Sequence, residues 1–76
     1  MEVDLHGLTI QQARVKVMGA LKRATPADYR LTLIHGYRGG SASRDMLRDE
    51  FSRHPSVIRL ESTFNPGQTV FVLREY

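Results

Sequence analysis

Cysteine is absent from the chain, and its absence excludes two kinds of site. Without thiols the protein can form neither disulfide bonds nor the thiolate ligand sets of structural zinc centres. No apolar run approaches the roughly 20 residues that a membrane-spanning helix needs. The first residues, Met1-Glu2-Val3-Asp4, lack the basic and apolar regions of a signal peptide. We therefore expect a cytoplasmic domain with no membrane partner.

Acidic side chains are in the minority, with 8 Asp and Glu against 11 Lys and Arg and a formal net charge of +3. Nine of the basic residues are arginine, which binds phosphate through two parallel hydrogen bonds. This balance favours nucleic acid or another polyanion over an acidic partner. Charge therefore indicates a class of partner and leaves its identity open.

The length of 76 residues suits a single domain, 1–76, with a thin core. Apolar periodicity predicts strands at 2–6, 29–35, 57–63 and 69–74, and helices from Thr9 to about Ala24 and from about Ala42 to Arg53. A helix joins the first two strands, so these should be parallel, with a right-handed crossover. The turn signal Asn65-Pro66-Gly67 predicts an antiparallel hairpin of the last two. The order β-α-β-α-β-β indicates an α/β fold, a two-layer sandwich of a mixed four-stranded sheet and two helices.

Both predicted helices carry a face for the core. Thr9 and Gln12 form a capping box at the start of the first helix. Apolar residues follow at helical spacing: Ile10, Ala13, Val17 and Leu21 in the first helix, and Met46, Leu47 and Phe51 in the second. The basic residues outside these stripes are interpreted as solvated, namely Lys16, Lys22, Arg23, Arg48 and Arg53. His54, before a proline, is interpreted as a capping or surface residue.

One short pattern occurs twice, as Leu5-His6-Gly7 and as Ile34-His35-Gly36. Each copy closes an apolar run and precedes a hydroxyl residue that can start a helix, Thr9 or Ser41. Two strands that end in this way should bring two imidazoles and two helix N-termini together, which favours an anion. The strand ends lie about 5 Å apart if the strands are neighbours and about 10 Å apart if another strand intervenes.

The first copy offers acid–base chemistry. Asp4 lies two residues before His6 and so points from the same face of the strand, where it could orient the imidazole or bind a metal. Phosphodiester cleavage needs a base and an acid, and His6 and His35 are the candidates. The alternative is that each histidine is a partly buried residue with a backbone partner. Gly7 and Gly36 would let a ligand approach the backbone, because they have no Cβ atom.

The second copy continues into a glycine-rich loop with nucleic-acid-binding candidates. The amides of Gly36, Gly39 and Gly40 could hold a phosphate. Arg38 and Arg44 could grip phosphates on either side of a cleaved bond, and Tyr37 could stack on a base. The alternative is that the glycines only shape a turn and that the arginines are solvated. The pattern is neither a P-loop nor a dinucleotide fingerprint.

The stretch Val3-Asp4-Leu5-His6-Gly7-Leu8-Thr9, followed by Ala13, resembles the first motif of the Smr (small MutS-related) domain family, Leu-Asp-Leu-His-Gly. Ile34-His35-Gly36 resembles the second motif, His-Gly-x-Gly. Asp4 and His6 match the first motif, and His35 and Gly36 match the second. Where the second motif has its last glycine this chain has Arg38, followed by Gly39 and Gly40. Either the loop is one residue longer or its turn is rebuilt.

The resemblance implies a fold related to the C-terminal domain of a bacterial initiation factor. It also implies nucleic-acid binding and, in many members, endonuclease activity on DNA or RNA. Some bacterial relatives act on messenger RNA at stalled ribosomes, and others form the end of MutS-like ATPases. The chain is accordingly interpreted as a free-standing Smr-like domain.

Three functional hypotheses follow. The first is an endonuclease in which Asp4 orients His6, and His6 and His35 share the roles of base and acid. The second is a module that binds nucleic acid or a ribosomal surface without cutting it. The third is a binder of small phosphorylated metabolites. No cofactor is indicated, and a divalent metal such as magnesium stays an open alternative. We expect a monomer, with RNA and DNA both open as partners.

Overall fold

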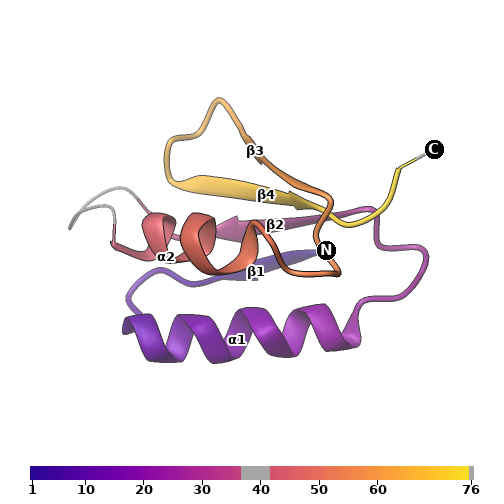
Figure 1. Ribbon diagram of the computed structural model, residues 1–76. Helices are drawn as coiled ribbons and strands as arrows, with labels where there is room; N and C mark the ends of the chain where they lie inside the picture. Colours follow the sequence, from indigo (N-terminus) through magenta and orange to yellow (C-terminus); the bar gives the residue numbers. More distant parts are fainter. Residues whose placement is uncertain (37–41, 76) are drawn as a thin grey trace.

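The computed structural model describes residues 1–36 and 42–75 (Figure 1). Its elements are β1 (Glu2–Asp4), α1 (Ile10–Arg23), β2 (Arg30–Ile34), α2 (Ala42–Phe51), β3 (Arg59–Ser62) and β4 (Gln68–Val72). The predicted order of strands and helices is confirmed. All four predicted strands and the second helix were too long by one or two residues at an end, and β4 also begins one residue earlier than predicted. Strand-forming side chains continue beyond the hydrogen-bonded ladder, so composition overstates strand length.

The sheet has the strand order β1-β2-β4-β3. β1 and β2 are parallel neighbours, with Asp4 opposite Ile34, as the intervening helix predicts. β2 and β4 are antiparallel, and so are β3 and β4, which confirms the hairpin and the mixed sheet. Because β1 and β2 run in the same direction side by side, their carboxyl ends lie at one edge of the sheet.

Both helices lie on one face of the sheet, which makes two layers (Figure 1). α1 begins with the predicted capping box: the Gln12 amide donates to Thr9 Oγ1, and the Thr9 amide donates to Gln12 Oε1. Its predicted stripe is buried, apart from the half-buried first position. The core contains Ala13, Val17, Leu21, Met46, Leu47 and Phe51 from the helices, and Val3, Leu5, Leu31, Leu33 and Phe71 from the sheet side.

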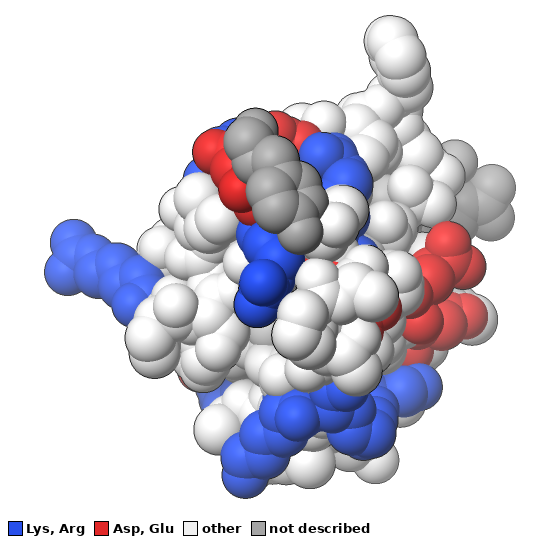
Figure 2. Space-filling model, turned by 90° about the vertical axis from the view of Figure 1, so that its right-hand side faces the viewer, with Lys and Arg blue, Asp and Glu red and all other residues white. Residues whose placement is uncertain are grey.

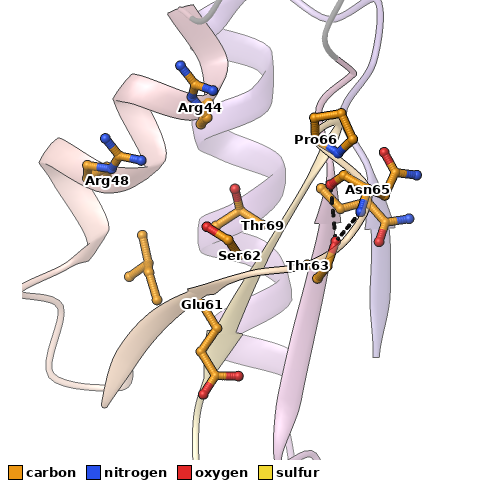
Figure 3. A pocket seen from close by; sticks show the side chains of 10 residues that line it. Arg44, Arg48, Glu61, Ser62, Thr63, Asn65, Pro66 and Thr69 are labelled. Atoms are coloured by element: carbon orange, nitrogen blue, oxygen red, sulfur yellow. Dashed lines mark hydrogen bonds between the residues drawn. The ribbon is translucent and has the colours of Figure 1, made fainter.

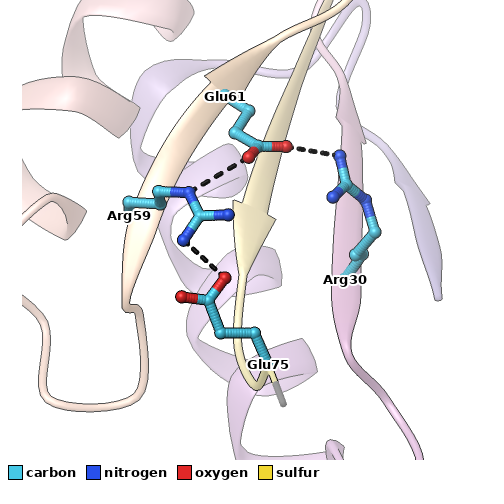
Figure 4. A network of polar contacts seen from close by, with 4 residues as sticks. All are labelled: Arg30, Arg59, Glu61 and Glu75. Atoms are coloured by element: carbon cyan, nitrogen blue, oxygen red, sulfur yellow. Dashed lines mark hydrogen bonds and ion pairs between the residues drawn. The ribbon is translucent and has the colours of Figure 1, made fainter.

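The other face of the sheet is covered by a chain of ion pairs (Figure 4). Arg30 Nη2 lies 2.6 Å from Glu61 Oε1, and Arg59 Nε lies 3.0 Å from Glu61 Oε2. Arg59 also pairs with Glu75, at 2.6 Å. Hydrogen bonds from Arg30 and then from Arg59 lower the pKa of Glu61. Arg30 of β2 and Arg59 and Glu61 of β3 stand opposite Val70 and Val72 of β4. Both valines are buried, although neither helix of the described chain lies on this face.

The end of the molecule opposite the carboxyl ends of β1 and β2 carries mixed charge. Figure 2 shows basic and acidic side chains interspersed over this end, with no single field of one sign. The last turn of α1, with Lys22 and Arg23, contributes to the basic side chains at this end. Within residues 1–36 and 42–75, neither helix is long and apolar enough to cross a membrane.

Candidate functional site

The first His-Gly site, at the end of β1, contains a carboxylate–imidazole pair. Asp4 Oδ1 lies 2.8 Å from His6 Nδ1 and also accepts a hydrogen bond from the His6 amide, at 3.0 Å. Both side chains are open to solvent, with exposed fractions of 72% for His6 and 54% for Asp4. The hydrogen bond from the imidazole, followed by the one from the amide, lowers the pKa of the Asp4 carboxyl. Asp4 is therefore held ionised against the ring.

This geometry determines which ring nitrogen is available. Nδ1 faces a carboxylate, so in the neutral ring Nδ1 carries the proton and Nε2 carries the lone pair. No described residue is hydrogen-bonded to Nε2. The imidazole can therefore accept a proton at an exposed nitrogen while Asp4 stabilises the resulting positive charge.

Lys16 adds a cation to this strand end. Its Nζ donates to the Asp4 carbonyl at 3.0 Å. The sequence placed Lys16 on a solvated helix face, and that interpretation is incomplete: one turn and a half into α1, the side chain reaches back to the end of β1. The missed signal is that a loop of only five residues separates β1 from α1, which keeps the helix start next to the strand end.

Both glycines of the repeated motif adopt the left-handed backbone conformation, with φ of 78° at Gly7 and 76° at Gly36. Only glycine takes this conformation without steric strain, which explains why both copies end in glycine. A Cβ atom on Gly36 would lie 3.8 Å from His6 Cβ. The second glycine therefore lies directly beside the first histidine.

The second His-Gly site is closed by internal hydrogen bonds. His35 Nδ1 lies 2.7 Å from the Gly36 carbonyl oxygen, and Nε2 lies 2.9 Å from Thr69 Oγ1. The amides of His35 and Gly36 both donate to the carbonyl of Gly67, at 2.9 and 3.0 Å. The ring is half-buried, and both of its nitrogens have partners. The Gly36 amide, a predicted phosphate donor, is likewise engaged within the fold.

The two imidazoles stand on different faces of the sheet. His6 shares the face of Asp4, away from the helices, whereas His35 bonds to Thr69, which lies opposite Leu33 on the helix side. Asp4 pairs with Ile34 in the parallel ladder, so His6, two residues further on, lies level with Gly36 and not with His35. β1 and β2 are neighbours, which is the case for which the sequence predicted strand ends about 5 Å apart. Side chains alternate between the two faces along each strand, however, so the two rings point to opposite faces of the sheet.

Comparison with known proteins agrees with these motifs. Residues 3–69 match the model of the Smr domain family. The chain belongs to the Smr family. The crystal structure of the Smr domain of Thermus thermophilus MutS2 is similar to it with a TM-score of 0.83 and 35% sequence identity, over 97% of this chain and 98% of that one. Among curated protein sequences there is no significant match.

Two residues of this Smr domain take part in the second site although the sequence did not mark them. Gly67 was interpreted only as part of a turn, yet its backbone lies against Gly36: a Cβ atom on Gly67 would lie 3.2 Å from Gly36 Cα. Thr69 was interpreted only as a strand residue, yet its hydroxyl holds the His35 ring. Both contacts depend on the pairing of β2 with β4, so no local pattern could have identified them.

The remaining predicted residues of the Smr domain lie near the second site or outside the described part of the chain. Arg44 stands in the first turn of α2, where its Nε is 3.9 Å from Asp45 Oδ1. The loop candidates Tyr37, Arg38, Gly39 and Gly40 lie outside the described residues. Within the described ranges, no three His, Asp or Glu residues gather as metal ligands.

Proposed function

We propose that this Smr domain is an endonuclease that cleaves RNA or DNA phosphodiester bonds with His6 as its proton-transferring residue. The observation that carries the proposal is the pair of Asp4 and His6, joined at 2.8 Å through Nδ1 while Nε2 faces solvent. Membership of the Smr family and the arginine-rich composition support nucleic acid as the ligand.

The proton moves as follows. An attacking hydroxyl, either the neighbouring 2′-hydroxyl of RNA or a water molecule, gives its proton to His6 Nε2 as the oxygen attacks phosphorus. The Asp4 carboxylate stabilises the imidazolium through Nδ1. Lys16, bonded to the Asp4 carbonyl, adds positive charge at the strand end where a phosphate would lie. The leaving oxygen is protonated from solvent at this open site.

His35 receives a positioning role in this proposal. To act as the acid of the reaction it would have to release either the Gly36 carbonyl or the Thr69 hydroxyl. As it stands, its ring ties the end of β2 to β4, and this holds Gly36 beside His6. The imidazole of the second motif therefore supports the site without transferring a proton.

A cleavage assay tests the proposal. Purified wild-type protein is incubated with single-stranded RNA and with supercoiled plasmid, with and without EDTA, beside His6→Ala and the control His54→Gln. We expect cutting by the wild type and by the control, and a loss of about 10²- to 10⁴-fold in His6→Ala. A 2′,3′-cyclic phosphate product identifies attack by the 2′-hydroxyl. Equal cutting by His6→Ala and the wild type would overturn the assignment.

A second function is favoured by the closed state of His35. Because the described residues offer only one imidazole with an unbonded nitrogen at this edge, the same surface could hold nucleic acid, including ribosomal RNA, without cutting it. This module would bind RNA or DNA with strong salt dependence and release no product. If the wild type binds RNA or DNA by fluorescence anisotropy but releases no product in the cleavage assay, this second function is supported. Cleavage by the wild type would reject it.

A further inference from the structure

A pocket of about 150 Å³ lies on the helix side of the sheet, between α2 and the β3–β4 hairpin (Figure 3). Arg44 and Arg48 line it from α2, and Ser62 of β3 and Thr69 of β4 line it from the sheet. Thr69 is also the residue that holds the His35 ring, so the pocket adjoins the second His-Gly site. Two guanidinium groups facing hydroxyls form a lining that suits a phosphate.

The positive charge of this pocket is largely uncompensated. Among the described residues Arg48 has no ion-pair partner, and the nearest carboxylate to Arg44 is that of Asp45, at 3.9 Å. Glu61 lies at the rim, but both of its oxygens are paired with Arg30 and Arg59 on the other face of the sheet (Figure 4). An anion that enters the pocket therefore meets two arginines and no free carboxylate.

The tip of the hairpin beside this pocket presents a bare aromatic ring. Phe64 has an exposed fraction of 108%, so no other part of the described chain covers it. Its neighbours Ser62, Thr63 and Asn65 line the arginine pocket, and Phe64 itself lines a second hollow with Arg30, Ser62 and Thr63. The two hollows share Ser62 and Thr63, so the ring stands next to the arginine pocket at the edge of the hairpin, on the side where Arg30 lies.

The tip is held in shape without Phe64. Thr63 Oγ1 bonds to the carbonyl and the amide of Asn65, both at 3.1 Å, and Asn65 Oδ1 accepts from the Gly67 amide at 2.8 Å. These bonds order the backbone on which the ring stands, so a ligand that stacks on Phe64 need not order the loop first.

We propose that Phe64, Arg44 and Arg48 form a subsite for single-stranded nucleic acid. The arginines grip one backbone phosphate in the pocket, and Phe64 stacks on an unpaired base. Bases inside a duplex have both faces covered by their neighbours, so the subsite selects strands whose bases are free. The inference rests on the proposed function, because it names the substrate class of the same domain.

The absence of tryptophan from the chain gives a direct test of stacking. In the full chain Phe64→Trp introduces the single tryptophan, whose emission can be excited apart from that of the tyrosines, and keeps an aromatic face. We expect its emission to be quenched by single-stranded RNA or DNA 12-mers and to change little with the matching duplex. RNA and DNA arms measured side by side show which backbone binds more tightly. Saturating single strand without quenching would overturn the stacking assignment.

Affinity measurements test the two halves of the subsite. By fluorescence anisotropy, Phe64→Ala should weaken single-strand binding about 5- to 100-fold, since one stacked base contributes on that scale. Arg44→Gln with Arg48→Gln should make the dependence of log K on log salt shallower by about 0.7, which is the loss of one phosphate contact on a single strand. Matched controls are Val15→Ala, an exposed apolar residue of α1, and the pair Lys22→Gln and Arg23→Gln at its far end.

The outcomes separate this inference from the proposed function. If the wild type binds and cuts but the Phe64 and arginine variants match their controls, the subsite is wrong and the endonuclease stands. If the wild type prefers duplex to single strand, the subsite is also wrong. If the wild type binds no nucleic acid at all, both are overturned. Circular dichroism and melting curves check that the variants fold, as expected for exposed positions.

Discussion

The two His-Gly sites are nearly the same in sequence and different in structure. At the first, His6 is exposed, bonded to a carboxylate through Nδ1 and open at Nε2. At the second, His35 is half-buried and bonded through both nitrogens, to Gly36 and to Thr69. The glycines, by contrast, are alike, with φ of 78° and 76°. The repeated glycine thus has one geometric cause, whereas the repeated histidine has two different environments.

Position in the sheet explains the difference. β1 is an edge strand, so the end that carries His6 has a neighbour on one side only. β2 lies between β1 and β4, so the end that carries His35 meets the hairpin turn and its Gly67 carbonyl. A histidine at an edge stays available for chemistry, and a histidine between strands becomes part of the framework.

The largest expected effect separates the two histidines directly. His6→Ala should reduce cleavage by about 10²- to 10⁴-fold and leave stability nearly unchanged. His35→Ala should lower the free energy of unfolding by about 2 kcal/mol, because two hydrogen bonds of about 1 kcal/mol each are lost. Urea unfolding at pH 7 and the cleavage assay measure the two quantities. A large stability loss in His6→Ala would contradict the assignment of a structural role to His35 and not to His6.

Asp4→Asn tests whether the carboxylate distinguishes the first site. We expect cleavage to fall by about 10- to 100-fold, since the asparagine amide carries no charge to stabilise the imidazolium that forms on His6. Because hydrogen bonds from His6 lower the pKa of Asp4, the wild type keeps this interaction until the pH falls below the ordinary value of 3.8. Cleavage rates of variant and wild type at pH 7 check this. Equal rates would mean that Asp4 does not support the imidazole.

Alanine substitutions at Gly7 and Gly67 distinguish the cost of backbone strain from the cost of steric crowding. Gly7→Ala should cost about 1 kcal/mol, from the left-handed conformation alone, because its Cβ would meet nothing within 4 Å. Gly67→Ala should cost about 2 kcal/mol, because its Cβ would press on Gly36 Cα at 3.2 Å and displace the hairpin from the second site. Chemical denaturation of both variants measures which one loses more of the free energy of unfolding. A larger loss at Gly7 would contradict the account of the second site.

The smallest effect concerns the face away from the helices. Hydrogen bonds from Arg30 and Arg59 lower the pKa of Glu61 below its ordinary value of 4.5. The stability that this adds is present above pH 4.5 and is lost as the pH falls through the lowered pKa. Glu61→Gln should therefore lower Tm slightly at pH 7, and the difference from the wild type should shrink below about pH 4.5. A constant difference at every pH would exclude the ionised carboxylate as its cause.

Local patterns predicted the elements well and the second site poorly. The capping box of Thr9 and Gln12, the buried stripe of α1 and the Asn-Pro-Gly hairpin each depend on residues close together in the chain, and each is confirmed. The parallel β1–β2 pair followed from one intervening helix. The hydroxyl partner of His35 comes from Thr69, 34 residues away, and no spacing rule predicts it.

The sequence by itself determined the family, the order of elements and the pair of Asp4 and His6, because two residues on one strand face need no other part of the chain to meet. The tertiary structure decided which histidine stays open, because that depends on strand order and register across the sheet. It also decided that the pocket of Arg44 and Arg48 adjoins the hairpin tip that carries Phe64, since α2 and the hairpin meet only when both pack on the same core. Local contacts can be read from spacing, whereas contacts between elements exist only in the folded molecule.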